Sequence, residues 1–254
     1  MTIKMKIKEE LALLLAESGA LFFADGLTLK DGRPTPYFVN FGLFRTGHLA
    51  TELGRVMADF LQSTKTTDGF DVLVGPSYKG SALAVAACSA LWQRHGIDKG
   101  FDYDRKEAKT HGEASAASTS FVTGALHDGA RILVIDDVAT TMGTKFEILQ
   151  RLTSEAVARG HSYYPAGVAL YLDREQTTAV YDRDGHAVPG AKGQDAVRNF
   201  KASTGLEVQT ITGIRDVIAF LSAQKIPVLQ NGIRQPLAAA AVDSLEAYLE
   251  AYGV

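Results

Sequence analysis

Short apolar segments rich in β-forming residues alternate along this sequence with segments of helical periodicity. The expected strands are residues 71–74, 132–135, 166–172 and 207–211. The expected helices are residues 48–62, 81–93, 144–159, 213–222 and 237–252. Strands separated by helices pair in parallel, and the helices then cover both faces of the sheet. The sequence therefore predicts an α/β fold with a mostly parallel sheet flanked by helices.

The overall composition limits the class of protein and its partners. A chain of 254 residues can bury a substantial core, and we expect residues 1–254 to form one domain. Its net charge of −3 does not favour nucleic acid as a partner. Cys88 is the only cysteine, which excludes a disulfide within the chain, and no apolar run is long enough to cross a bilayer. We therefore expect a cytoplasmic protein that binds no membrane.

Two further segments have patterns that differ from the strand–helix alternation. Residues 8–17 predict a helix, and residues 27–40 alternate apolar and polar side chains around Asp31-Gly32, which is typical of a hairpin. Residues 177–195 are polar and rich in turn-forming residues, so we expect a hairpin or loop excursion on the surface.

The stretch RILVIDDVATTMGTK, residues 131–145, places two adjacent carboxylates after an apolar strand. Ligands of parallel sheets bind where strands end, so Asp136 and Asp137 can accept hydrogen bonds from ligand hydroxyls or metal-bound water. The following hydroxyl-rich turn leads into a helix N-terminus, which can bind phosphate. These features fit a ribose 5-phosphate. A turn whose aspartates cap the helix, or a magnesium-binding phosphoacceptor domain, fits the same spacing.

The same stretch resembles the phosphate-loop motif of the type I phosphoribosyltransferase family. The resemblance implies that family's fold and a loop that holds the 5-phosphate of phosphoribosyl pyrophosphate. The loop residues would be Val138, Ala139, Thr140, Thr141, Met142, Gly143 and Thr144. Ala139 stands where the family usually has a larger aliphatic residue, and Met142 where it usually has glycine. Because glycine adopts positive φ at little cost, the loop conformation at Met142 is left open.

Other segments resemble one branch of that family, the orotate phosphoribosyltransferases. Residues 28–47 are similar to its N-terminal hood, which we expect to be built mainly from residues 1–47, although an ordinary amphipathic hairpin has the same alternation. Residues 74–80, VGPSYKG, are similar to its pyrophosphate loop, and the family's non-proline cis peptide would fall at Ser77–Tyr78. The residues implied to contact substrate in these segments are Lys30, Phe38, Val39, Tyr78 and Lys79.

Residues 103–113, YDRKEAKTHGE, have the composition of a solvated loop, but they resemble the family's catalytic loop. The basic residues that carry this resemblance are Arg105, Lys106, Lys109 and His111. In the family this loop closes over the active site of the neighbouring subunit, so the resemblance implies a homodimer. Arg174 in YLDREQ resembles the family's orotate-recognition residue, although a lone arginine often forms a surface ion pair.

The resemblance implies transfer of ribose 5-phosphate from phosphoribosyl pyrophosphate to orotate in pyrimidine biosynthesis, giving orotidine 5-phosphate and pyrophosphate. The implied catalytic residues are Arg105, Lys109, His111, Asp136 and Asp137. We expect no dedicated protein metal site, because Mg²⁺ would bind mainly through pyrophosphate, ribose hydroxyls and water. Two alternatives are a phosphoribosyltransferase for another base and a non-catalytic ligand sensor of the same fold.

Overall fold

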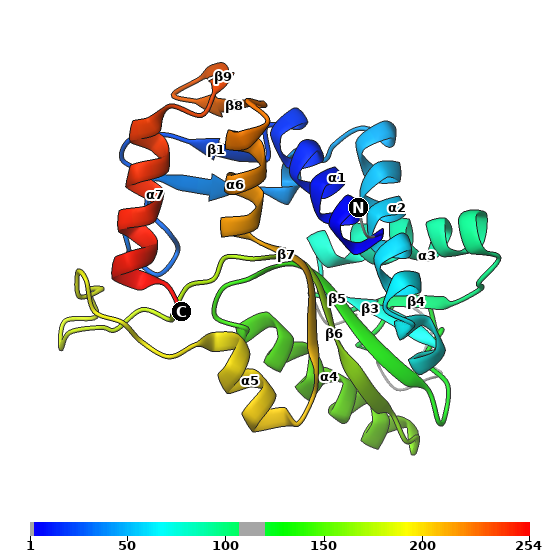
Figure 1. Cartoon of the computed structure of the whole chain (residues 1–254). Helices are drawn as coiled ribbons and strands as arrows, with labels where there is room; N and C mark the ends of the chain where they lie inside the picture. The colour runs from blue at the N-terminus through cyan, green and yellow to red at the C-terminus, as the bar shows by residue number, and fades with distance from the viewer. Residues whose placement is uncertain (1–2, 107–119) are drawn as a thin grey trace.

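The computed structural model describes residues 3–106 and 120–254 as a mixed α/β structure (Figure 1). Its α-helices are α1 (Ile3–Glu17), α2 (Gly47–Ser63), α3 (Lys79–His95), α4 (Gly143–Arg159), α5 (Ala196–Thr204), α6 (Ile214–Ala223) and α7 (Ala239–Tyr252). Its strands are β1 (Leu21–Phe23), β2 (Tyr37–Val39), β3 (Val72–Gly75), β4 (Gly100–Tyr103), β5 (Arg131–Ala139), β6 (Tyr164–Asp173), β7 (Val208–Gly213), β8 (Pro227–Gln230) and β9 (Ile233–Pro236). Short 3₁₀ helices occur at Phe41–Leu43 and Thr66–Gly69.

The main sheet has the order β4-β3-β5-β6-β7, and its strands pair in parallel. Successive side chains of β5 alternate between two hydrophobic clusters. Leu133 and Ile135 join the cluster that includes α1, α2 and α3, whereas Ile132 and Val134 join the cluster under α4 and α5. Helices therefore cover both faces of the sheet (Figure 1), as the sequence predicts.

A second, smaller sheet has the order β2-β1-β8-β9 and lies beside α6 and α7 (Figure 1). Its outer pairs are antiparallel, and its central pair, β1 with β8, is parallel. Its strands come from both ends of the chain, because β1 and β2 belong to residues 1–47 and β8 and β9 lie close to the C-terminus. The sequence patterns did not indicate β1, β8 or β9, each of which has only three or four residues.

The hairpin expected within residues 27–40 is shorter than its alternation suggests. The turn is present at Asp31-Gly32, and Leu29 N donates to Arg33 O at 2.9 Å, but only Thr28 and Pro34 form a bridge. The apolar residues beyond it, β2, pair with β1 instead. Pairing of β2 with β1 buries Tyr37 and Val39 in the core, which a freestanding hairpin could not do.

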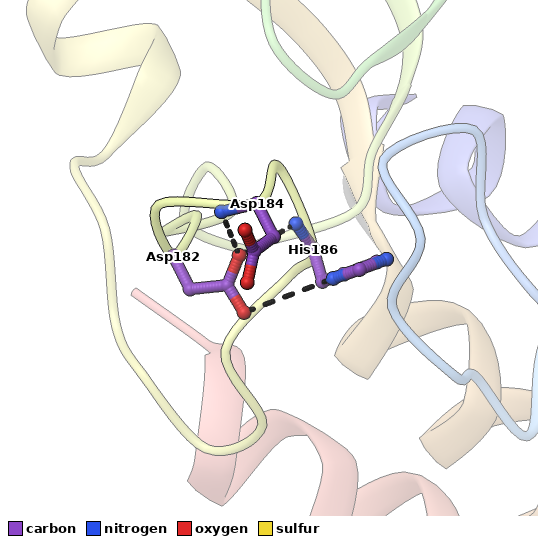
Figure 2. Close-up of side chains that lie close together, drawn as sticks. All are labelled: Asp182, Asp184 and His186. Atoms are coloured by element: carbon purple, nitrogen blue, oxygen red, sulfur yellow. Dashed lines mark hydrogen bonds and ion pairs between the residues drawn. The ribbon is translucent and has the colours of Figure 1, made fainter.

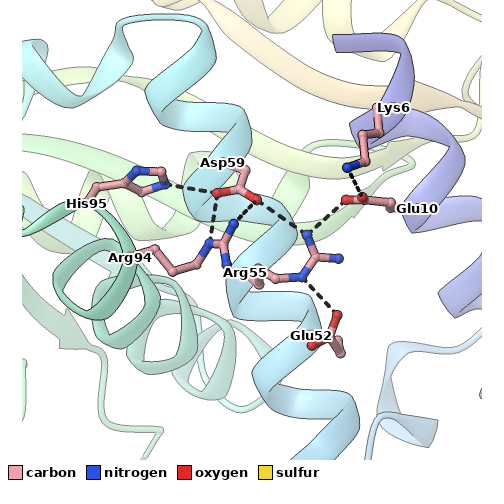
Figure 3. A network of polar contacts seen from close by, with 7 residues as sticks. All are labelled: Lys6, Glu10, Glu52, Arg55, Asp59, Arg94 and His95. Atoms are coloured by element: carbon pink, nitrogen blue, oxygen red, sulfur yellow. Dashed lines mark hydrogen bonds and ion pairs between the residues drawn. The ribbon is translucent and has the colours of Figure 1, made fainter. Parts of the chain in front are cut away.

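A polar network joins the outer surfaces of α1, α2 and α3 (Figure 3). Arg55 on α2 donates to Glu10 on α1 at 2.9 Å. Asp59 on α2 accepts from Arg94 at 3.0 Å and lies 2.9 Å from His95, both at the end of α3. Additional members are Lys6 and Glu52. Partly exposed ion pairs contribute little singly, so the network mainly fixes how these helices lie against α2.

Residues 177–195 run out from the end of β6 and return before α5, with isolated antiparallel bridges at Thr177–Asp195 and Tyr181–Ala187. Most side chains between these bridges are exposed. The expected strands and helices elsewhere are confirmed with shifted ends, and β4 and α5 are additional elements that the sequence patterns missed. Among the described helices, none has the length and apolar character required to cross a membrane.

Candidate functional site

The candidate site lies at the carboxyl ends of three neighbouring strands. β3 pairs with β5 on one side, and β6 pairs with β5 on the other, where Ala139 lies opposite Asp173. Because the strands are parallel, the turn after β3, the loop after β5 and Arg174 after β6 emerge at the same edge of the sheet. The topology thus brings together three of the segments that the sequence singled out.

Asp136 and Asp137 lie within β5 rather than after it, because β5 continues to Ala139. Both residues are only 7% exposed. Asp137 N donates to Asp136 Oδ1 at 2.9 Å, and Val138 N donates to Asp137 Oδ1 at 2.8 Å. Burial, and then the neighbouring Asp136 charge, raises the pKa of Asp137. The sequence correctly placed the acids at the sheet edge but ended their strand too early.

Two lysines contact the acid pair. Lys145, which is 3% exposed, places its Nζ 2.6 Å from Asp136 Oδ2 and donates to Val138 O at 2.9 Å. Lys79, at the start of α3, is exposed and donates to Asp137 Oδ2 at 3.2 Å. The sequence patterns did not single out Lys145. A signal was available, since Lys145 has the helical spacing of the buried α4 residues Ile148 and Leu152.

The loop from Val138 to Thr144 connects the acid pair to α4. Met142 is the residue before α4 and adopts φ 61° and ψ 5°, the left-handed conformation that favours glycine. Its side chain is buried in the cluster beneath α4, which accounts for a methionine at this position. Thr141 and Thr144 are exposed, and Thr144 Oγ1 donates to Asp136 Oδ2 at 3.3 Å. Hydroxyls and helix N-terminal N–H groups thus lie next to the carboxylates.

The turn after β3 contains a cis peptide between Ser77 and Tyr78, as the resemblance predicted. Tyr78 and Lys79 follow it, and both side chains are exposed. Gly75 and Gly80 approach each other so closely that a Cβ atom on either would overlap backbone atoms of the other. The turn is therefore tight and presents Lys79 toward Asp137.

Arg174 follows β6 and is only 4% exposed. Its Nε donates to Tyr37 Oη at 3.2 Å, and its guanidinium carbon lies 4.7 Å from the centre of the Tyr37 ring and 5.9 Å from that of Phe38. Its Nη2 is buried and has no hydrogen-bond partner among the described residues. A buried donor of this kind is costly unless an acceptor meets it, so Nη2 is suited to a ligand oxygen.

The other residues expected near the base are placed differently. Val39 is buried in the core, and strand alternation directs it to the opposite face of β2 from Phe38. Lys30 lies exposed in the turn before Asp31. Tyr37, which the sequence patterns did not single out, accepts the hydrogen bond from Arg174. Its position beside Phe38 in an alternating stretch did not distinguish it from an ordinary core tyrosine.

Two residues of the expected catalytic loop, Lys109 and His111, lie outside the described residues. Lys106 is exposed. Arg105 N donates to Ser120 O at 2.8 Å, and Arg105 O accepts from Arg151 Nη1 at 2.8 Å. Arg105 therefore lies beside α4, and so does Ser120, whose N–H donates to Glu155 Oε2 at 2.7 Å.

A separate group of possible metal ligands lies on the excursion: Asp182, Asp184 and His186 (Figure 2). All three are exposed. Asp182 Oδ1 accepts from the backbone N–H groups of Asp184 and His186, each at 2.9 Å. These bonds are those of a polar turn, and within residues 3–106 and 120–254 no further feature indicates a cation there.

Comparisons with known proteins agree with the geometry. No family model matches the chain. Orotate phosphoribosyltransferase from Thioalkalivibrio sulfidiphilus is 34% identical over 247 residues, which cover 97% of this chain and 98% of that protein. The enzyme of the same name from Chromohalobacter salexigens is 35% identical over 240 residues, covering 94% and 91%. The crystal structure of Francisella tularensis orotate phosphoribosyltransferase superposes with a TM-score of 0.69 at 25% identity, over 95% of this chain and 98% of that one.

Proposed function

Because the chain belongs to the orotate phosphoribosyltransferase family, we propose that it converts orotate and phosphoribosyl pyrophosphate to orotidine 5-phosphate and pyrophosphate in pyrimidine biosynthesis. One observation supports the roles that we assign to particular residues. The acid pair, the loop before α4 and Arg174 leave adjacent parallel strands at the same edge, with Ala139 opposite Asp173. This edge offers separate groups for the sugar, the phosphate and the base.

The sugar phosphate is held by β5 and the loop that follows it. Asp136 and Asp137 accept hydrogen bonds from the ribose hydroxyls, and the loop from Val138 to Thr144 holds the 5-phosphate with N–H groups and hydroxyls. The lysines at Asp136 and Asp137 support this role, because they keep two adjacent buried carboxylates compatible with the fold.

The reaction separates charge, with positive charge developing on the sugar and negative charge on the departing pyrophosphate. We assign the basic residues Lys79, Arg105, Lys106, Lys109 and His111 to the pyrophosphate. Fixed charges that meet charge developing in the transition state each contribute about 10²- to 10³-fold to turnover. The reaction needs no covalent intermediate with the protein, so positioning and electrostatics suffice.

The residues at the site fit Mg²⁺ in an indirect role. Asp136 Oδ2 is already engaged by Lys145 and Thr144, which leaves few free carboxylate oxygens for direct coordination. Mg²⁺ prefers oxygen ligands and retains several waters, so it would be held by pyrophosphate, ribose hydroxyls and water beside Asp137. When bound, it supplies charge neutralisation of the leaving group.

The base is placed by the residues around Arg174. The unpartnered Nη2 of Arg174 donates to an orotate oxygen, and Phe38 offers an aromatic face beside the Arg174 guanidinium. Lys30 remains a proposed base contact from the exposed turn before Asp31. Val39 would act only indirectly, by packing in the core on the opposite face of β2 from Phe38. A purine carries no carboxylate for Arg174, which favours orotate over other bases.

We further propose a single domain of residues 1–254 in a cytoplasmic homodimer whose subunits share the catalytic loop. The hydrophobic cluster common to both sheets supports one domain. The shared loop is tested by mixing two inactive variants, Lys109→Ala and Asp137→Asn. Mixed dimers contain one site free of both substitutions if the loop crosses between subunits. Activity that does not return after mixing and exchange of subunits would exclude sharing.

The function is tested by measuring nucleotide formation from phosphoribosyl pyrophosphate with orotate, uracil, hypoxanthine or adenine. We expect turnover with orotate alone, accompanied by stoichiometric pyrophosphate release. Turnover with a purine only would overturn the base assignment. Binding of phosphoribosyl pyrophosphate without any turnover would favour a ligand sensor.

A further inference from the structure

Asp104 is a buried carboxylate, 4% exposed, immediately after β4. Its Oδ1 accepts a hydrogen bond from Ser77 N at 2.6 Å, and its backbone carbonyl accepts from Ser77 Oγ. Ser77 is the first residue of the cis peptide in the turn after β3. Asp104 therefore holds this turn at the residue that precedes Tyr78 and Lys79.

The second carboxylate oxygen of Asp104 contacts Arg151 on α4. Arg151 on α4 places its Nη1 3.0 Å from Asp104 Oδ2, and the same nitrogen donates to Arg105 O at 2.8 Å. Arg105 N donates in turn to Ser120 O. One buried carboxylate thus connects the turn that carries Lys79 with the backbone that carries Arg105.

We propose that Asp104 is a positioning residue for pyrophosphate, which couples the turn at Ser77 to Arg105 through Arg151. This inference rests on the proposed function, which assigns Lys79 and Arg105 to the pyrophosphate. Each oxygen of Asp104 orients one of the two segments. Loss of its charge therefore weakens binding of the pyrophosphate end of the substrate and leaves the orotate end, at Arg174 after β6, unchanged.

Asp102, two residues earlier on β4, is a matched control. It is also fully buried, and its Oδ1 accepts from the backbone N–H groups of Tyr103, Val122 and Thr123. No described hydrogen bond joins it to Ser77 or Arg151. A carboxylate that is merely structural behaves like Asp102, whereas a positioning residue changes the binding of one substrate selectively.

The test compares Asp104→Asn, Arg151→Gln and Asp102→Asn with the unmodified protein. Asparagine keeps an acceptor for Ser77 N but replaces the charge facing Arg151. We expect Asp104→Asn to raise the KM for phosphoribosyl pyrophosphate, and the Kd for magnesium pyrophosphate measured by calorimetry, by tenfold or more. The KM for orotate should change by less than twofold, and Asp102→Asn should leave the ratio of the two KM values unchanged.

Arg151 is about one-third exposed, so Arg151→Gln is expected to fold and provides the second variant. It should shift the same constants in the same direction, and the double variant should add less than the sum of the single effects. Additive effects, equal changes in both KM values, or an unchanged Kd for pyrophosphate in a folded Asp104→Asn protein would each overturn the proposal. The pyrophosphate measurement involves no base, so it remains decisive even if the unmodified protein fails to use orotate.

Discussion

Asp136 and Asp137 are nearly buried at the end of a central strand, whereas Asp182 and Asp184 lie exposed on the excursion of residues 177–195 (Figure 2). The buried pair is met by Lys79 and Lys145 at 3.2 and 2.6 Å. Of the exposed group, Asp182 accepts from two backbone N–H groups of its own turn, and the Asp184 side chain faces solvent. The two groups of acids therefore differ in two ways: whether the fold buries the carboxylates, and whether lysines or solvent and backbone N–H groups balance their charge.

Burial of Asp136 and Asp137 lowers the stability of the fold, but it also strengthens the hydrogen bonds that their carboxylates can accept from a ligand. A carboxylate out of water requires a counter-charge, and once paired it offers strong, oriented acceptors to a ligand. An exposed carboxylate costs nothing but interacts weakly, because water screens it. The comparison predicts large consequences for changes in the buried pair and small ones for changes on the excursion.

The largest effect is expected for Lys145→Met, which leaves Asp136 without its buried counter-charge. Breaking a buried ion pair by removing one partner costs about 3–5 kcal/mol of unfolding free energy. Denaturant unfolding of both proteins measures this difference. The control is Lys201→Met, which removes an exposed partner of Glu207 and should cost less than about 1 kcal/mol. Equal costs for the two variants would contradict the difference between buried and exposed charge.

Asp137→Asn should lower turnover by about 10²- to 10³-fold, because it removes one charged group at the reacting sugar. It should not lower stability at pH 7. The folded-state pKa of Asp137 is raised by burial and by Asp136, so its ionised form opposes folding. That contribution is favourable below the unfolded pKa of about 4 and is lost as pH rises through the folded pKa. The variant should therefore gain stability relative to the unmodified protein as pH rises above about 4. A parallel stability curve at all pH values would contradict this sign.

A smaller effect is expected for Thr144→Val, which removes the hydroxyl that donates to Asp136 Oδ2 at 3.3 Å. The loss of one hydrogen bond beside a retained lysine should cost about 1 kcal/mol of unfolding free energy. In the same variant the KM for phosphoribosyl pyrophosphate should rise, while the KM for orotate stays constant. Thr144→Ser restores the hydroxyl and should restore both values. If serine fails to do so, the methyl group rather than the hydroxyl is responsible.

The smallest effect is expected for Asp184→Asn on the excursion. Unfolding free energy should change by less than about 0.5 kcal/mol, because the side chain is exposed and Asp182 provides the acceptor of the turn. Turnover should be unchanged within a factor of two. Thermal unfolding with and without added Mg²⁺ or Ca²⁺ checks whether the group binds a cation. A metal-dependent rise in Tm that disappears in the variant would show that the excursion is a site after all.

Much of the main sheet and of the phosphate side of the site could be predicted from sequence. The apolar segments that became β3, β5, β6 and β7 carry local patterns, and parallel pairing brings their ends to one edge. The resemblance left the conformation at Met142 open, and the structure answers it with φ 61°, the region that glycine adopts easily. The cis peptide at Ser77–Tyr78 was likewise expected from the resemblance alone.

Local residue chemistry thus determined the alternation of strands and helices, the acid pair at the sheet edge and the hydroxyl-rich loop, because their patterns span only a few neighbouring residues. Tertiary structure alone decided the pairing of β1 with the distant β8, the contact of Arg174 with Tyr37 and the position of Lys145 against Asp136. These features depend on which segments pack together to exclude water, and no short stretch of sequence contains both partners of such a contact or the burial that gives it its strength.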